Sequence, residues 1–368
     1  MSRTPHFRRT IAGVLPFLAV LCLAVQPAHA QTAPDELLLK DFRPHSAWKT
    51  PVTTVEKARY PVIDMHSHPY AKGAEAIAEW VETMDACGID KTVILTYAVG
   101  ARFDSIAALY NAHPGRFILY CGFDYRGYDE PGFGPAAVAE LERCYEAGAR
   151  GVGELGDKGK GLFYCETKAW GMHIDDPRMD PLLEKCGELN MPVSIHVAEP
   201  IWMYLPMDST NDGLMNAYEW RLDNQPDILG HGEMVETLEN AVKRHPETTF
   251  IACHYANCGY DLSILGRMFD RYPNLYADIG ARYAEVAPVP RSTAAFFEKY
   301  ADRLVYGTDM GTDADMYRVT FRVLESADEH FYETGQFGYH WALHGLDLPE
   351  AVLEKVYRAN ALRIMGEK

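Results

Sequence analysis

Two histidines separated by one residue end an apolar run, Val62-Ile63-Asp64-Met65-His66-Ser67-His68. If this run is a β-strand, its side chains alternate, so His66 and His68 point the same way about 6.6 Å apart. Two imidazoles in that arrangement can bind one metal ion. A single His-x-His pair is common by chance, however, so this motif needs support from the rest of the chain.

Three further ionisable residues end apolar runs in the same manner, namely His196 after 193–195, His254 after 250–253 and Asp309 after 305–308. Any one of them alone is more often a hydrogen-bonded core residue than a ligand. Their occurrence together predicts that the ends of several parallel strands meet around one metal ion.

The elements that must position these residues alternate along the chain between runs rich in β-branched residues and helical patterns, which is typical of repeated βα units. Eight parallel strands with intervening helices predict a single (β/α)8 TIM barrel. The strands are expected at 62–66, 91–97, 117–123, 150–154, 192–197, 249–254, 275–279 and 304–308. Helices are expected at 75–87, 103–112, 135–147, 180–189, 233–244 and 349–365. The long loops after strands four and five lie on the face where barrels build active sites.

The first thirty residues are typical of a signal peptide, with early arginines, an apolar stretch at 11–25 and the small-x-small sequence Ala28-His29-Ala30. We expect cleavage after Ala30 and export to the periplasm or the medium; an uncleaved anchor is the competing interpretation. Arg8-Arg9 is a weak match to a twin-arginine signal. Residues 31–58 are expected to form an N-terminal extension, and residues 59–368 the barrel.

The chain has 368 residues and a net charge of −17. Removing residues 1–30 takes away three arginines and no acidic residue, which makes the charge −20. Such a protein is a poor partner for nucleic acid, whose binding depends on lysine and arginine. No later segment is apolar for long enough to insert stably in a membrane. The cysteines have no zinc-finger or disulfide spacing, so buried thiols are expected.

The ordered pattern of ligands resembles the amidohydrolase superfamily: His-x-His on strand one, histidines on strands five and six, and aspartate on strand eight. The likeness extends over about residues 60–320. The segments 63–68 and 306–309 are most similar to the amidohydrolase-related branch, which contains lactonases, hydratases and decarboxylases. Larger members add a small β-sandwich domain; here the N-terminal segment is too short and the tail is helical, so we expect none.

The segment Gly151-Val152-Gly153-Glu154-Leu155-Gly156 resembles the Gly-Glu segment of the TatD-type metal-dependent hydrolases. That likeness implies that Glu154 ligates or bridges a second metal ion. The alternative, a carboxylate hydrogen-bonded to a ligand histidine or to substrate, is equally well supported. A carboxylated lysine on strand four is not available, because Lys158 and Lys160 lie beyond the strand.

A bound divalent ion, expected to be Zn²⁺ with Mn²⁺ as the alternative, lowers the pKa of water to about 7. The number of ions, one or two, stays open. Asp309 is the expected proton shuttle from water to the leaving group. His254 either ligates a second metal or, with one metal bound, orients the substrate.

Aromatic residues of the loop after strand five, Trp202 and Tyr204, are candidates for the wall of a substrate site, although such residues more often hold a long loop in place. Arg221 and Arg282 could bind a substrate carboxylate through paired hydrogen bonds. Ordinary surface ion pairing is an equally good explanation for both arginines.

The sequence therefore favours a metal-dependent hydrolase acting on a small lactone, ester or amide. A metal-dependent lyase, either a decarboxylase or a hydratase, is the alternative. A TatD-like nuclease ranks third because of the negative charge, and a binding module without activity ranks last. The expected partner is a small-molecule substrate; self-association into a homo-oligomer stays open.

Overall fold

The computed structural model describes residues 33–367, so the predicted signal peptide lies outside the described part of the chain. Residues up to Phe42 form one unit, which contains a short 3-10 helix at Leu39–Asp41, and residues from Arg43 form another. Residues 43–58, expected to be an extension, belong to the second unit. There the Thr53 amide and hydroxyl donate hydrogen bonds to Asp328, at 2.8 and 2.7 Å.

The second unit is built on eight parallel strands, which follow one another around a barrel in the order β1-β2-β3-β4-β7-β8-β9-β10. Their bounds are β1 Val62–Ser67, β2 Ile89–Leu95, β3 Phe117–Cys121, β4 Gly151–Asp157, β7 Val193–Val197, β8 Phe250–Ala252, β9 Leu275–Asp278 and β10 Leu304–Val305. The prediction of a single (β/α)8 barrel is confirmed. The sheet has one addition that was not expected, a small antiparallel hairpin of β5 (Gly161–Leu162) and β6 (Ala169–Trp170).

Backbone hydrogen bonds close the barrel between its first and last strands. The Met65 amide donates to the Tyr306 carbonyl oxygen at 2.9 Å, and the Thr308 amide donates to the His66 carbonyl oxygen at 3.2 Å. Strand β8 ends at Ala252 and β10 at Val305, before the expected ends at 254 and 308, so His254 and Asp309 lie in the segments beyond these strands. Closure brings the end of β1 beside Asp309.

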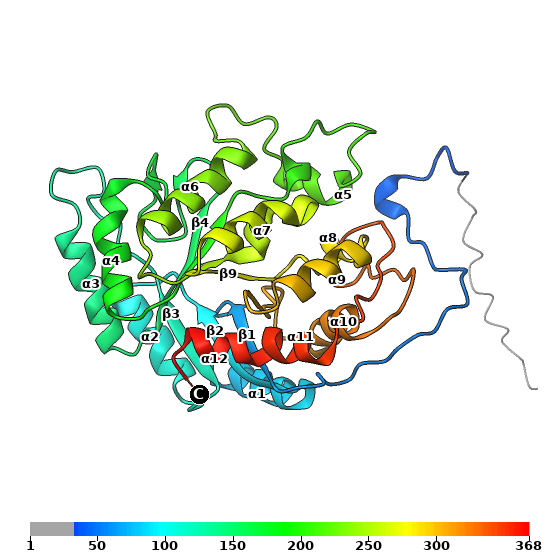
Figure 1. Ribbon diagram of the computed structural model, residues 1–368, viewed down its shortest axis with the longest axis horizontal. Coiled ribbons are helices and arrows are strands. Elements are labelled where there is room, and N and C mark those ends of the chain that lie inside the picture. The colour runs from blue at the N-terminus through cyan, green and yellow to red at the C-terminus, as the bar shows by residue number, and fades with distance from the viewer. Residues whose placement is uncertain (1–32, 368) are drawn as a thin grey trace, which may run out of the picture. The chain divides into compact units, whose positions relative to one another are not determined.

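Helices surround the barrel, with α2, α3 and α4 along one side and α10, α11 and α12 along another (Figure 1). The longer helices are α1 Ala74–Cys87, α2 Gly100–Tyr110, α3 Pro135–Glu146, α4 Asp180–Glu188, α6 His231–Arg244, α7 Leu262–Arg271, α9 Pro290–Lys299 and α10 Ala314–Glu325. The short ones are α5 Leu214–Ala217, α8 Tyr283–Val286, α11 Glu350–Glu354 and α12 Asn360–Ile364, with a π-helical turn at Lys355–Ala359 between the last two.

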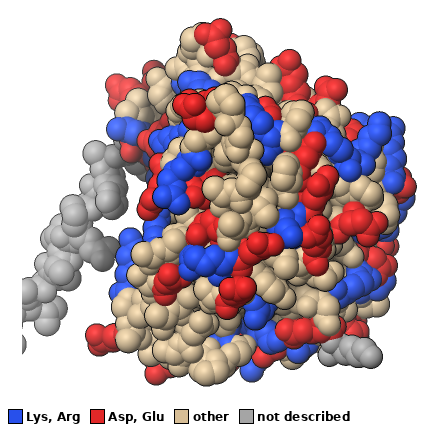
Figure 2. Space-filling model, turned by 90° about the vertical axis from the view of Figure 1, so that its left-hand side faces the viewer, with Lys and Arg blue, Asp and Glu red and all other residues tan. Residues whose placement is uncertain are grey.

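Most buried apolar residues separate into two cores, as expected for a barrel, and a small third cluster contains Met203, Ala217 and Leu222. Inside the barrel lie residues such as Ile63, Val93 and Ile251, while a larger cluster fills the space between strands and helices. On the face shown in Figure 2, acidic and basic side chains are interspersed without a continuous band of either sign. No helix in the described range is long and apolar enough to cross a membrane. The seven cysteines of the described residues are free thiols.

The loop after β4 is held by one buried carboxylate. Asp157 accepts hydrogen bonds from the amides of Gly159 and Gly161, at 2.9 and 3.0 Å, and from Nδ1 of His173 at 2.6 Å. The hydrogen bond with Asp157 raises the pKa of His173, against the effect of burial. This interaction fixes the bend that contains Lys158.

A raised pKa makes the His173–Asp157 contribution to stability depend on pH. The contribution is fully present below the unfolded-state pKa of about 6.5 and is lost as the pH rises through the folded-state pKa. We expect His173→Asn to lower the free energy of unfolding more at pH 6 than at pH 9.5, as measured by urea denaturation. His113→Asn is the matched control, because the His113 ring packs against Phe117 and has no ion pair within the described residues. A pH-independent difference would contradict this prediction.

Closure of the barrel also requires a residue without a side chain at position 307. A Cβ atom on Gly307 would lie 2.8 Å from the Cβ atom of His66 and 3.4 Å from that of Asp278. We expect Gly307→Ala to push these strands apart and to destabilise the protein by about 1–3 kcal/mol. The midpoint of urea unfolding measures the effect. Gly232→Ala is the control, because a Cβ atom there meets nothing within 4 Å; equal stability of the two variants would refute the argument.

Candidate metal centre

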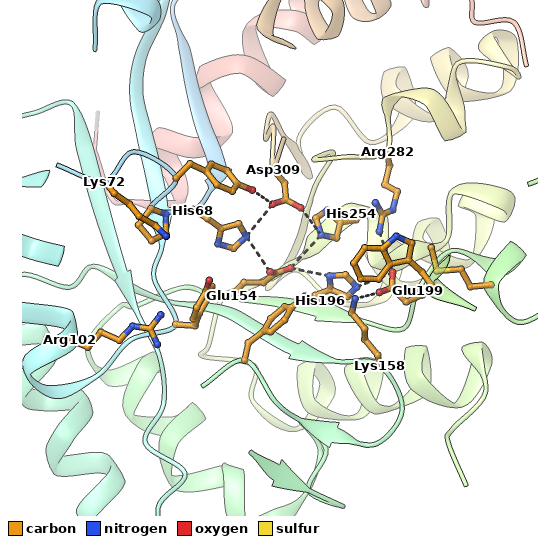
Figure 3. Close-up of a pocket in the computed structure, with 16 residues that line it drawn as sticks. His68, Lys72, Arg102, Glu154, Lys158, His196, Glu199, His254, Arg282 and Asp309 are labelled. Atoms are coloured by element: carbon orange, nitrogen blue, oxygen red, sulfur yellow. Dashed lines mark hydrogen bonds and ion pairs between the residues drawn. The ribbon is translucent and has the colours of Figure 1, made fainter. Parts of the chain in front are cut away.

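The six side chains expected to bind metal all meet at the carboxyl ends of the barrel strands. His66 lies on β1, Glu154 on β4 and His196 on β7, whereas His68 directly follows β1 and His254 and Asp309 lie in the segments beyond β8 and β10. All of them except His66 are shown in Figure 3. The set is His66, His68, Glu154, His196, His254 and Asp309. The structure thus brings together every expected ligand, although these residues are separated by up to about 240 positions in the chain.

The four imidazoles are oriented alike, because one ring nitrogen of each faces a protein oxygen outside the centre. Nδ1 of His66 is 2.9 Å from Asp278 Oδ2, and Nδ1 of His68 is 2.9 Å from the Leu95 carbonyl oxygen. Nδ1 of His254 is 2.9 Å from the Gly280 carbonyl oxygen, and Nε2 of His196 is 2.9 Å from that of Ala198. A carbonyl or carboxylate oxygen accepts hydrogen bonds, so these nitrogens donate, and the other nitrogen of each ring faces inward, where the lone pair of a neutral ring can bind a metal ion.

Two carboxylates lie between the inward nitrogens. Glu154 Oε1 is 3.1 Å from His196 Nδ1 and 3.4 Å from His254 Nε2, and Glu154 Oε2 is 3.5 Å from His68 Nε2. Asp309 Oδ1 is 3.1 Å from His68 Nε2, and Oδ2 is 3.5 Å from His254 Nε2. Both remain ionised. Burial raises the pKa of each carboxyl group, but the hydrogen bonds and charges of the histidines together outweigh burial and lower the pKa.

The donors form two compact triads, His66, His68 and Asp309 on one side and Glu154, His196 and His254 on the other. Imidazole nitrogen and carboxylate oxygen are the donors that suit Zn²⁺ and Mn²⁺. Nε2 of His66 is buried and has no hydrogen-bond partner among the described residues, which is costly unless a cation binds it. The residues present therefore fit one or two divalent ions.

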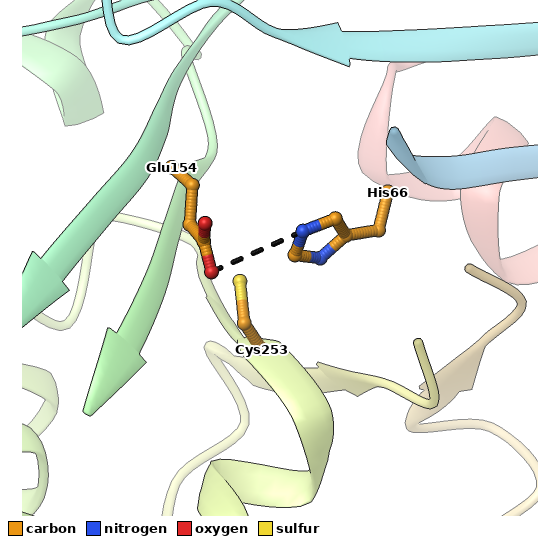
Figure 4. Close-up of side chains that lie close together, drawn as sticks. All are labelled: His66, Glu154 and Cys253. Atoms are coloured by element: carbon orange, nitrogen blue, oxygen red, sulfur yellow. Dashed lines mark ion pairs between the residues drawn. The ribbon is translucent and has the colours of Figure 1, made fainter. Parts of the chain in front are cut away.

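Cys253 is a further donor atom near this centre that sequence analysis did not identify. It forms a compact group with His66 and Glu154 (Figure 4). Burial raises the pKa of its thiol well above the ordinary value. A protonated thiol is a poor ligand, so the imidazoles and carboxylates remain the better donor set.

An unusual backbone turn directs His254 into the centre. Four consecutive residues, His254 to Asn257, have positive φ angles of 60°, 56°, 52° and 53°, and none of them is glycine. This conformation is strained for L-amino acids. It is held by a hydrogen bond from the His254 amide to Asp278 Oδ1 at 3.1 Å, and by another from Asn257 Nδ2 to the Val197 carbonyl oxygen at 3.0 Å.

A cavity of about 810 Å³ opens over the donors. Of the four residues expected to bind substrate, Arg282 lines it; Trp202, Tyr204 and Arg221 are not among its lining residues. The loop that contains them folds on itself instead. Trp202 donates a hydrogen bond to Asp212 at 2.5 Å, Tyr204 packs beside His231, and Arg221 pairs with Asp223 at 2.6 Å. The expected substrate contacts of these three residues therefore have no counterpart in the cavity wall.

The wall contains residues that sequence analysis did not assign to the site. The aromatic ones are Tyr70, Tyr97, Tyr164 and Trp220, and the charged ones are Lys72, Arg102, Lys158 and Glu199. Their order in the sequence shows no common pattern, because they lie on loops after different strands. Glu199 alone carried a signal that could have been used, a carboxylate three residues after a strand-end histidine.

Glu199 is the buried acidic residue that organises one side of the cavity. It forms an ion pair with Lys158, and its Oε2 is 3.7 Å from Arg282 and 3.6 Å from Nε2 of His196. Burial raises the pKa of Glu199, but the positive charges of His196, Lys158 and Arg282 outweigh it and lower the pKa. The Arg282 guanidinium is held further by Asn257 Oδ1, at 2.9 Å from Nε.

Asp278 orients both His66 and the turn at His254, so its loss should weaken metal binding without removing a ligand. We expect Asp278→Asn to lower metal affinity about 10- to 100-fold. Competition with a chelator measures the affinity, and circular dichroism checks the fold. Asp270→Asn is the control, because Asp270 is an exposed residue of α7 that pairs with Lys299. Unchanged metal affinity in Asp278→Asn would show that Asp278 does not position the ligands.

Comparison with known proteins places the chain in context. A 2,6-dihydroxybenzoate decarboxylase from Rhizobium is 18% identical, with 83% of this chain and 99% of that chain covered and a TM-score of 0.51. A dihydroxybenzoic acid decarboxylase from Polaromonas, solved with bound manganese, is 15% identical, with 83% of this chain and 97% of that chain covered and a TM-score of 0.52. A 5-carboxyvanillate decarboxylase from Novosphingobium aromaticivorans, also solved with manganese, is 16% identical, with 86% of this chain and 100% of that chain covered and a TM-score of 0.50. At these identities the likeness shows a common fold.

A search of curated proteins finds no match. The comparisons do not bear on the likeness of segment 151–156 to the TatD-type hydrolases. The model of the family described as Amidohydrolase matches residues 28–366, which is nearly the whole chain. The chain therefore belongs to the amidohydrolase family.

Proposed function

We propose that this protein is a metal-dependent hydrolase that uses activated water to cleave a small lactone, ester or amide. The observation that carries the proposal is the pair of donor triads, each with histidine nitrogens and one carboxylate. Two adjacent divalent ions can activate water and stabilise the oxygen that leaves. Glu154 is central to this choice, because it supplies the carboxylate of the second triad.

A divalent ion bound by these residues supplies Lewis acidity, which makes water more acidic and polarises an oxygen of the substrate. Asp309 is the residue that takes up the proton. Its carboxylate lies between His68 and His254 and borders the cavity, within reach of both water and a leaving group. The Tyr70 hydroxyl donates a hydrogen bond to Asp309 Oδ1 at 3.0 Å and so holds this carboxylate in position.

The cavity wall favours a small ring compound with negative charge. Tyr97 and Tyr164 lie with their ring centroids 5.8 Å apart, and Trp220 lies under the Lys158 ammonium group at 5.3 Å. Such surfaces stack against a planar ring. Arg282, beside His254 and Asp309, is the group that can bind a carboxylate close to the reacting bond.

Decarboxylation is a second candidate reaction, and it is supported by the chemistry of proteins with the same fold. Three of them are decarboxylases of hydroxylated or methoxylated benzoates, and two of those were solved with manganese. The same donors could hold the carboxylate and phenol oxygens of such a substrate, with Mn²⁺ rather than Zn²⁺ as the ion.

Metal content and product analysis distinguish the two reactions. We expect the wild type to hold close to two equivalents of divalent metal by elemental analysis, Glu154→Ala to hold about one, and His66→Ala to hold less than the wild type. The metal-loaded wild type should hydrolyse a member of a panel of lactones, esters and amides without releasing carbon dioxide. The control is Glu166→Ala, since Glu166 is exposed and lies outside the donor set.

One equivalent that is unchanged in Glu154→Ala, together with carbon dioxide release from hydroxybenzoates, would overturn the hydrolase and favour the lyase. A protein without metal after growth in medium supplemented with zinc and manganese would exclude both reactions.

A further inference from the structure

The cavity has an excess of positive side chains that the proposed reaction does not use. Its lining includes four cationic residues, Lys72, Arg102, Lys158 and Arg282, in a chain with 52 acidic and only 35 basic residues. Of the carboxylates that line it, Glu154 and Asp309 face the metal donors. Glu199 remains to balance the four cations.

Glu199 balances only one side of the cavity. It pairs with Lys158 and Arg282, and Arg282 is also 3.3 Å from Glu285 Oε1. In Figure 3 these two cations lie on one side of the donor centre, whereas Lys72 and Arg102 are drawn on the opposite side, with Lys72 the nearer of the two to His68. Neither Lys72 nor Arg102 has an ion pair within the described residues. The unbalanced positive charge is therefore on the Lys72 side.

Arg102 is unusual among the arginines of this protein. Within residues 33–367, Arg102 and Arg291 are the two arginines that have neither a hydrogen-bond acceptor nor an ion pair, and Arg291 lies outside the cavity. The guanidinium of Arg102 is instead held over the Tyr97 ring, 5.6 Å from its centroid. A guanidinium stacked in this way keeps its donor edge available for an anion.

Tyr97 also connects Arg102 with the metal donors. The Tyr97 and His68 ring centroids are 5.6 Å apart, so one aromatic side chain separates Arg102 from a candidate ligand. A small ring compound whose reacting group lies at the metal centre would extend past Tyr97. A substituent at its far end would then reach Arg102 and Lys72.

We propose that the cavity selects substrates with a carboxylate at the end remote from the reacting bond, bound by Arg102 and Lys72. This inference rests on the proposed function for the location of the reacting bond. It adds the substrate class: a small ring compound with a second anionic group. Arg102 supplies the directional hydrogen bonds, since its fork matches a carboxylate, and Lys72 supplies charge.

Binding of simple probes tests the subsite without turnover. The probes are benzoate, with one carboxylate, and isophthalate and terephthalate, with two, titrated calorimetrically into the full-length protein loaded with Mn²⁺. We expect at least one dicarboxylate to bind the wild type about 2- to 5-fold more tightly than benzoate, a size typical of a partly exposed ion pair. Arg102→Gln and Lys72→Gln should each reduce that preference, while the affinity for benzoate stays within about twofold.

Arg291→Gln is the matched control, because it removes the other arginine without a partner, on helix α9. It should leave all three affinities unchanged. The preference should also shrink in 0.5 M salt, because the pair is exposed. Equal affinity of the wild type for all three probes, the absence of dicarboxylate binding, or an equal loss of benzoate and dicarboxylate affinity in Arg102→Gln would overturn the inference.

The experiments distinguish an error in the proposed subsite from an error in the proposed reaction. A protein that binds dicarboxylates through Arg102 but hydrolyses nothing in the panel keeps the subsite and loses the proposed function. A hydrolase whose KM for an anionic ester is the same in Arg102→Gln and the wild type keeps its function and loses the subsite.

Discussion

The interaction on which the rest of this structure depends is the outward hydrogen bond of each imidazole in the buried centre. Four histidines and two carboxylates lie close together only because each ring directs one N–H away, to Asp278, Leu95, Gly280 or Ala198. That arrangement directs the other ring nitrogens and the carboxylate oxygens toward one another, as a divalent cation would require. The barrel therefore holds a preformed candidate site for divalent metal, and its closure at Gly307 supports it.

Charge is distributed around this centre in layers. Glu154 and Asp309 face the inward histidine nitrogens, Asp278 behind them orients His66 and the turn at His254, and Glu199 to one side holds Lys158 and Arg282. Among the described residues that line the cavity, Lys72 and Arg102 are the cations that no carboxylate balances. A strongly acidic protein can thus present a locally cationic cavity to a small anionic substrate.

Backbone strain and loop packing position the residues around the centre. The left-handed turn after β8 contains no glycine and is held by Asp278 and Asn257. Their hydrogen bonds stabilise a backbone conformation that is unfavourable by itself. Asp157 holds the loop that brings Lys158 to Glu199. Strand ends and their hydrogen bonds hold the candidate metal donors, whereas residues of loops form much of the cavity wall.

The sequence by itself determined the barrel and the donor set, because strand periodicity and residues at strand ends are local signals and a closed barrel brings all strand ends to one rim. His66, His68, Glu154, His196, His254 and Asp309 could be found in this way. Only the tertiary structure decided that Trp202 bonds to Asp212 and Tyr204 packs beside His231, that Glu199 joins Lys158 to Arg282, and that Arg102 stacks on Tyr97. Some of these contacts are local and others join distant loops, but all depend on how loops fold and pack, which has no periodicity that a single sequence reveals.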